Sequence, residues 1–403
     1  MTGRNGRGLR EKPMTIIFNI VIFGLAFLML RLPYRYSLAL VAIVVVALLR
    51  MERKGAVDAL FSLYIRNRRV AAFSALICIL AIPVLLSTFR YQSHIAVMAL
   101  IYAMVCLGLN FQMGSTNMVN FAPAAFMGIG AYSMAVMTVK IGVSPWLGML
   151  TAILTSAFAG LLIGLPTLRT KGYYLSLVTM ALQLAFVQLI KNMPSIGGPN
   201  GISGVKAFSI GGFSLYKAYT FFGVKLTPHF FYLIFCAFAL IILVYVAQRI
   251  YISRYGLALN NIAQDEIAAN CLGVDVPRCK LFAFVIGGVY CGVGGALYAS
   301  LTSFVGPNDF TFARSLVFIC MVILGGMDNP IGVTVGAFLL TVITEKLRNF
   351  SDYAQLIYAV LLVVILIVRP SGLIPKRVRD YCAVFGRELL SPSRPDAGPA
   401  DKD

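Results

Sequence analysis

Long runs of apolar residues, separated by short polar turns, recur along most of the chain. A transmembrane helix needs about 20 predominantly apolar residues, and each run approaches or reaches that length. The pattern therefore predicts about twelve helices in a membrane. The runs lie near Met14–Leu30, Tyr36–Leu49, Val70–Phe89, Ile95–Phe111, Phe121–Val139, Trp146–Leu165, Tyr173–Ile190, His229–Ala247, Leu281–Phe304, Phe312–Leu324, Ile331–Ile343 and Tyr353–Val368.

Composition supports an all-α polytopic membrane protein. Hydrophobic residues make up 59% of the 403 positions, charged residues 12%, and the mean hydropathy is +0.85. These values exclude a soluble globular domain. The spans contain little charge, which gives no support to a proton relay. Their glycines, as in Gly287-Gly288 and Gly294-Gly295, favour close helix packing.

Basic residues predict the orientation. Lys and Arg outnumber Asp and Glu by 34 to 15, and they sit in short loops beside apolar runs, so membrane orientation explains them better than nucleic acid does. Both termini are predicted to be cytoplasmic, with 253–280 inside and 191–228 outside. The main clusters are Arg4, Arg7, Arg10 and Lys12, then Arg50, Arg53, Lys54, Arg66, Arg68 and Arg69, then Lys376, Arg377 and Arg379.

Three regions are expected along the chain. Residues 1–69 form a basic segment and a two-helix membrane extension, whose first helix is retained because no small-residue cleavage pattern follows it. Residues 70–380 form the core. Residues 381–403 form a cytoplasmic tail, which its proline and charge content predicts to be disordered.

The polar stretch from Ser253 to Lys280 interrupts the apolar pattern and predicts a short helix outside the lipid. Its small residues would let another protein approach closely, so the shared face of this helix suits docking of a partner. That face carries Leu259, Ile262, Glu266, Ala269 and Gly273, spaced by three and four residues.

Two segments look like helix breaks, which in transporters often line a polar cavity. The alternative is an ordinary interfacial turn. The candidate pathway residues are Asn110, Asn117 and Asn120 in the first segment, and Gly325 and Gly326 in the second. Neither a catalytic residue nor a metal site is predicted.

A protease is a weaker alternative. Gly201-Ile202-Ser203-Gly204 matches a GxSG pattern, with His229 downstream as a possible base. Ser203 lies in a glycine-rich polar loop rather than at the start of a membrane helix, which disfavours this interpretation. No GxxxxGK[ST] phosphate loop occurs, so any ATP must be bound by another chain.

Several segments resemble, in order, the permease subunits of bacterial branched-chain amino acid ABC importers, of the LivM type. The most specific is Gln264–Ala269 through Leu272-Gly273-Val274, similar to that family's coupling loop. The others are Leu107–Asn110, Ala124–Phe126 with Gly128–Tyr132, Gly197–Gly201, Gly295–Ala299, Leu324–Met327 and Arg369–Leu373.

The resemblance implies about ten core helices of the type II importer kind in the bacterial inner membrane. It implies two ABC ATPase subunits, a second homologous permease and a periplasmic binding protein that delivers leucine, isoleucine or valine. No cofactor is expected on this chain, which would act as a transport subunit and not as an enzyme. The coupling residues would be Ile262, Asp265, Glu266, Ala268, Ala269 and Gly273, with the two carboxylates pairing with groups on the ATPase and the small residues allowing close contact.

Two departures keep alternatives open. Leu257, Asn260 and Ala263 stand where family members commonly carry arginines, and Ala122-Pro123 replaces a Gly-His pair. Relatives of the family carry urea or short amides, which remain alternative substrates. A channel or facilitator that needs no energy subunit is the alternative class.

Overall fold

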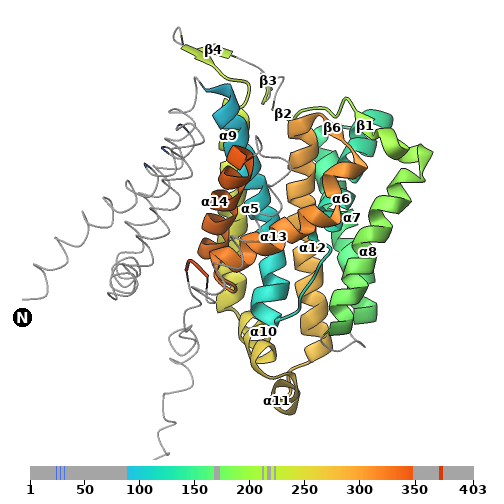
Figure 1. The fold of residues 1–403 in the computed structure, drawn as a ribbon, viewed down its shortest axis with the longest axis vertical. Coiled ribbons are helices and arrows are strands. Elements are labelled where there is room, and N and C mark those ends of the chain that lie inside the picture. Colours follow the sequence, from blue (N-terminus) through green and yellow to red (C-terminus); the bar gives the residue numbers. More distant parts are fainter. Residues whose placement is uncertain are drawn as a thin grey trace, which may run out of the picture.

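The computed structural model describes residues 89–167, 173–210, 213–215, 219–221, 224–347 and 372–374, with isolated positions 24, 28 and 31. The predicted helices of 1–69, the runs at 70–89 and 353–368, and the tail 381–403 therefore lie almost wholly outside the described residues. Within the described part, the chain forms a helical bundle with short strands at one end (Figure 1).

Every apolar run predicted between residues 95 and 343 is helical, which confirms the all-α fold class. Five of the described helices, α5, α7, α8, α9 and α12, are long and apolar enough to cross a membrane. The helices are α5 (Arg90–Thr116), α6 (Pro123–Ala135), α7 (Pro145–Thr167), α8 (Tyr173–Lys191), α9 (Phe230–Ile252), α10 (Arg254–Gln264), α11 (Glu266–Cys271), α12 (Val276–Thr302), α13 (Phe312–Gly325) and α14 (Pro330–Leu347).

Helix α12 is the centre of the bundle and packs against α5, α6 and α7. Its glycines make these close approaches possible, as the sequence predicts. A Cβ atom on Gly287 would lie 3.1 Å from the backbone oxygen of Gly108 in α5, and one on Gly292 would lie 2.8 Å from that of Ala152 in α7. Gly295 faces the backbone of α6.

Helices α6 and α13 are shorter than the five candidate spans because they begin inside the bundle. After α5 ends, residues 117–122 run back without regular secondary structure to the start of α6 (Figure 1). Irregular backbone at membrane depth is tolerated where protein groups satisfy it. Here Thr179 of α8 accepts a hydrogen bond from the Phe121 N–H, and Ser176 donates one to the Val119 carbonyl.

The two ends of the bundle differ. One carries antiparallel strand pairs: β1 (Ile202–Ser203) with β6 (Phe304–Val305), β2 (Ser209–Ile210) with β3 (Phe213–Ser214), and β4 (Tyr219–Phe221) with β5 (Val224–Leu226). The short helices η1 (Val136–Lys140), η2 (Pro194–Ile196), η3 (Gly198–Asn200) and η4 (Pro307–Phe310) connect the longer elements.

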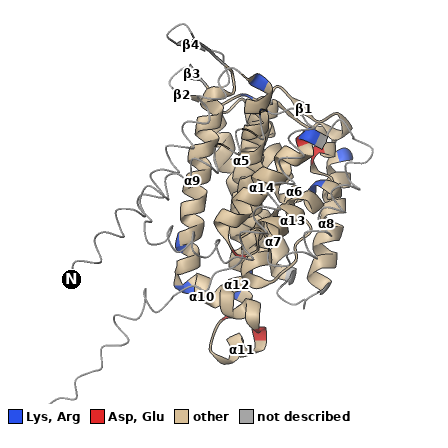
Figure 2. Cartoon of the chain, turned by 60° about the vertical axis from the view of Figure 1, so that its left-hand side comes forward, with Lys and Arg blue, Asp and Glu red and all other residues tan. Residues whose placement is uncertain are grey.

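The other end carries α10 and α11, so segments 191–228 and 253–280 lie at opposite ends, as predicted (Figure 1). Figure 2 shows that charged residues gather mainly toward these ends, which suits a membrane around the middle. Which end faces the cytoplasm stays a prediction.

Candidate functional site

The predicted docking helix is two helices and not one. Asp265 adopts an extended conformation with φ −156° between α10 and α11. Its side chain caps α11, because Oδ1 accepts hydrogen bonds from the N–H groups of Ile267 (2.8 Å) and Ala268 (3.2 Å). Asp265 therefore stabilises the corner, and its carboxylate has a structural role that the resemblance did not imply.

The face predicted to dock a partner is turned mainly inward. Leu259, Ile262 and Ala269 are each no more than 2% exposed. Ile262 and Ala269 form a small apolar cluster with Val276 at the start of α12. Ile262 and Ala269 therefore pack within their own chain in this conformation, and a coupling role for them stays a prediction. The shared helical face is apolar because it seals α10 and α11 against their own chain.

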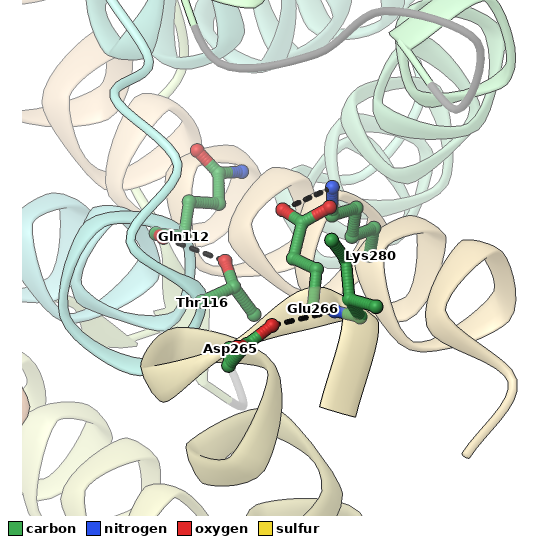
Figure 3. A network of polar contacts seen from close by, with 6 residues as sticks. Gln112, Thr116, Asp265, Glu266 and Lys280 are labelled. Carbon is green, nitrogen blue, oxygen red and sulfur yellow. Dashed lines mark hydrogen bonds and ion pairs between the residues drawn. The ribbon is translucent and has the colours of Figure 1, made fainter. Parts of the chain in front are cut away.

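Glu266 is also engaged within the chain. Its carboxylate lies 2.6 Å from Nζ of Lys280, which is 9% exposed in the first turns of α12 (Figure 3). The Glu266 side chain is still 46% exposed, so its pairing with a group on a partner stays a prediction. The pair joins α11 to the central helix, and the buried ammonium depends on this carboxylate.

The exposed surface of α11 is different from the one expected. Ile267 and Leu272 are both 77% exposed, an unusual position for large apolar side chains beyond the spans. Ala268 is exposed beside them. Gly273, also exposed, has φ +81° in the turn after α11, a conformation that favours glycine. Of the predicted coupling residues, Asp265, Glu266, Ala268 and Gly273 are exposed, whereas Ile262 and Ala269 are buried.

The two predicted breaks meet in space although more than 200 residues separate them. Asn110 of α5 accepts a hydrogen bond from the Asp328 N–H and donates one to the Tyr251 hydroxyl, both at 2.8 Å. Ser115 donates to the Asp328 carboxylate at 2.8 Å. Asn110 and Asp328 are buried. This network fastens the end of α5 to the turn between α13 and α14.

Among the remaining pathway candidates, three residues are buried and one is exposed. Asn120 is buried and donates to Gln112 Oε1 at 2.5 Å, whereas Asn117 is exposed at the end of α5. Gly325 and Gly326 are buried against neighbouring backbone. The amides of Asn110 and Asn120 therefore hold the breaks together in this conformation. A pathway role for any of these residues stays a prediction.

A second buried network supports the start of α6. Gln183 of α8 accepts from the Ala125 N–H at 2.7 Å and donates to the Phe310 carbonyl at 2.6 Å. Ser315 of α13 accepts from the Ala124 N–H and donates to Gln183. The first N–H groups of a helix lack partners within it, so these side chains satisfy them.

Replacing Gln183 with Leu is expected to destabilise the protein by about 2 to 4 kcal/mol, because two buried backbone groups lose their partners. Thermal unfolding of the purified protein in detergent measures the effect. Gln188→Leu, an exposed change on the same helix, is the control and should shift the midpoint far less. Equal midpoints for the two variants would contradict the capping role.

Ser203 and His229 occupy different surroundings. Ser203 is exposed in β1 and pairs with Phe304, whereas the His229 ring packs edge-to-face on His94 with centroids 5.3 Å apart. Burial lowers the pKa of His229 to about 4, with His94 and Arg90 contributing, so its imidazole is neutral near pH 7. Nothing in these contacts supports a Ser/His pair.

Charge inside the bundle was missed by the sequence analysis. Arg314 follows the start of α13, and its guanidinium donates a 3.0 Å hydrogen bond to Tyr102 in the middle of α5. The start of α13 lies inside the bundle, so a charge at the end of an apolar run need not be interfacial. The apolar run at 312–324 is short for a membrane span, and this shortness was the available sign that its helix begins inside the bundle.

Comparison with known proteins agrees with the resemblance. Residues 91–368 match the family described as branched-chain amino acid transport system / permease component. The chain is 35% identical over 324 residues to the high-affinity branched-chain amino acid transport permease LivM of Salmonella typhimurium, covering 77% of this chain and 75% of that protein. Identity to LivM of Escherichia coli is 34%, with the same coverage.

The chain is also similar to permeases of the LivH name. One from Methanocaldococcus jannaschii is 23% identical over 300 residues, covering 68% of this chain and 90% of that protein. No solved structure gives a significant match. The family match spans most of the bundle, including both breaks and the α10–α11 segment. This multi-pass membrane protein therefore belongs to the branched-chain amino acid transport permease family.

Proposed function

We propose that the chain is the permease subunit of an ATP-driven importer of leucine, isoleucine and valine. The observation that carries the proposal is α11, a capped helix beyond the spans, which exposes Ile267 and is followed directly by the exposed Leu272. Exposed apolar residues in such a position favour burial against another protein. The chain has no phosphate loop, so an ATPase is the partner that an importer would need there.

The proposed complex follows from the names of the relatives and from the resemblance. Two ATPase subunits would bind at the α10–α11 end, which would then be cytoplasmic, and a periplasmic binding protein would deliver substrate at the strand end. A second permease, of the LivH kind, would complete the pathway in a bacterial inner membrane. The relatives' names refer to branched-chain amino acids, which supports this substrate class over urea.

The ion pair between Glu266 and Lys280 offers a route for transmission. Motion of α11 would pass through this pair into α12. Because α12 packs tightly on α5, α6 and α7, its displacement would shift packed helices together rather than one at a time. Alternating access would then follow from ATPase movement without covalent chemistry on this chain.

ATP-dependent uptake into proteoliposomes tests the proposal. The vesicles would contain this chain, its partner permease, the ATPases and the binding protein, with labelled leucine or labelled urea as substrate. Leucine uptake that requires ATP supports it. Uptake of urea alone would change the substrate, and leucine uptake without ATP would indicate a facilitator.

Shortening Ile267 and Leu272 to Ala together is expected to weaken ATPase binding about tenfold or more, since buried apolar anchors commonly contribute over 1 kcal/mol each. Pull-down of the ATPase on detergent-solubilised permease measures the affinity. Ile141→Ala, 61% exposed outside the α10–α11 segment, is the matched control. If the double variant binds ATPase as the control does, α11 is not the docking element.

A further inference from the structure

Opposite charges lie on one segment that follows β6, where η4 passes into α13. Asp309 and Arg314 are both partly buried. Asp309 Oδ2 accepts a hydrogen bond from the Gly306 N–H at 3.2 Å, and Arg314 bonds to Tyr102, with its Cζ 5.5 Å from the ring centroid. Charged groups among membrane helices are costly and commonly mark functional sites.

Three tyrosines from three different helices surround these charges. Tyr102 in α5 bonds to Arg314, and the rings of Tyr132 in α6 and Tyr298 in α12 both pack on Phe310, the residue after Asp309. The two opposite charges therefore share one aromatic, hydroxyl-rich site at the meeting point of α5, α6, α12 and α13.

The Tyr132 hydroxyl points to a ligand. Tyr132 is only 5% exposed, and its hydroxyl has no hydrogen-bond partner among the described residues. Its ring packs on Phe310, next to Asp309, with centroids 6.2 Å apart. A buried hydroxyl without a partner costs free energy unless something else satisfies it.

We propose that Asp309, Tyr132 and Arg314 bind the charged head of an amino acid on its way through the permease. Arg314 would bind the α-carboxylate. Asp309 would bind the α-ammonium, which would also donate to the Tyr132 hydroxyl. This inference rests on the proposed function, because it names the site at which that substrate is recognised.

The pair of opposite charges also favours an amino acid over urea. The zwitterionic head of an amino acid presents both a carboxylate and an ammonium, whereas urea carries no charged group.

The test measures binding of labelled leucine to the purified permease–ATPase complex without binding protein. Competition by leucinamide, which lacks the carboxylate, and by 4-methylpentanoate, which lacks the ammonium, reports each contact separately. Arg314→Gln is expected to weaken leucine binding about tenfold to hundredfold. Leucine should then bind this variant no more tightly than leucinamide does. In the Asp309→Asn variant, leucine is expected to bind no more tightly than 4-methylpentanoate does. When removing a protein side chain and removing a ligand group have non-additive effects on affinity, the two groups are in direct contact.

Two further variants separate recognition from folding. Tyr132→Phe removes a hydroxyl that has no partner, so it should leave the complex folded yet weaken leucine binding about two- to tenfold. Arg249→Gln is the matched control, because Arg249 also bonds to and stacks on a tyrosine, Tyr245, but at the end of α9 next to α10. It should leave leucine binding unchanged.

Failure of this inference is distinct from failure of the proposed function. If the intact transporter imports leucine with ATP, but the complex binds no leucine or all variants discriminate among the three ligands as the native chain does, the site is overturned alone. If the native transporter does not import branched-chain amino acids at all, the proposed function fails and the inference falls with it.

Discussion

Exchanging Glu266 for Lys is expected to reduce leucine uptake about tenfold or more, because the buried Lys280 ammonium loses its counter-charge and meets a second cation. The two groups lie 2.6 Å apart, and Lys280 is the less exposed partner, so repulsion cannot be relieved by moving Lys280 into water. α11 should separate from α12. Transport would then fail even where the protein inserts normally.

Uptake into proteoliposomes, normalised to the amount of assembled complex, measures this effect. The Lys280→Glu variant should lose leucine uptake to a similar degree. The double exchange, Glu266→Lys with Lys280→Glu, restores opposite charges and should recover most of the uptake. If the double exchange is no better than either single change, the pair does not transmit movement. The control is Arg278→Glu, which breaks the exposed Asp275–Arg278 pair but leaves Asp275 in place as the N-cap of α12.

Replacing Gly295 with Val is expected to prevent stable folding. A Cβ atom at this position would lie 2.8 Å from the backbone nitrogen of Ala131 and would press on the Met127 carbonyl of α6. Backbone cannot rotate away as a side chain can, so α6 and α12 must move apart. Such overpacking commonly costs about 1 to 3 kcal/mol, and separation of two helices costs more.

The amount of folded protein in membranes and its thermal midpoint in detergent measure the loss. Gly164→Ala on α7 is the control, because the nearest atom there is the end of the Leu281 side chain, 2.7 Å away, which can change rotamer. Gly164→Ala should therefore fold. Normal accumulation of Gly295→Val would show that α6 and α12 are less tightly packed than their backbone separation indicates.

Hydropathy and short motifs were sufficient to predict the helices at 95–343, the all-α class and the family. These features are local, because a run of apolar residues must be helical in lipid whatever its neighbours are. The glycines of α12 were also correctly interpreted as packing positions. Local spacing could not show that Ala269, a small residue on a shared face, packs in one cluster with Ile262 and Val276 of its own chain.

The sequence alone therefore determined which segments enter the membrane, because burial of backbone in lipid depends on each segment's own composition. Only the tertiary structure decided what the polar residues do. It joined Asn110 to Asp328, paired Glu266 with Lys280, and brought Asp309 and Arg314 among three tyrosines. Such contacts link residues far apart in the chain, and their partners are set by how the helices pack rather than by the pattern within any one of them.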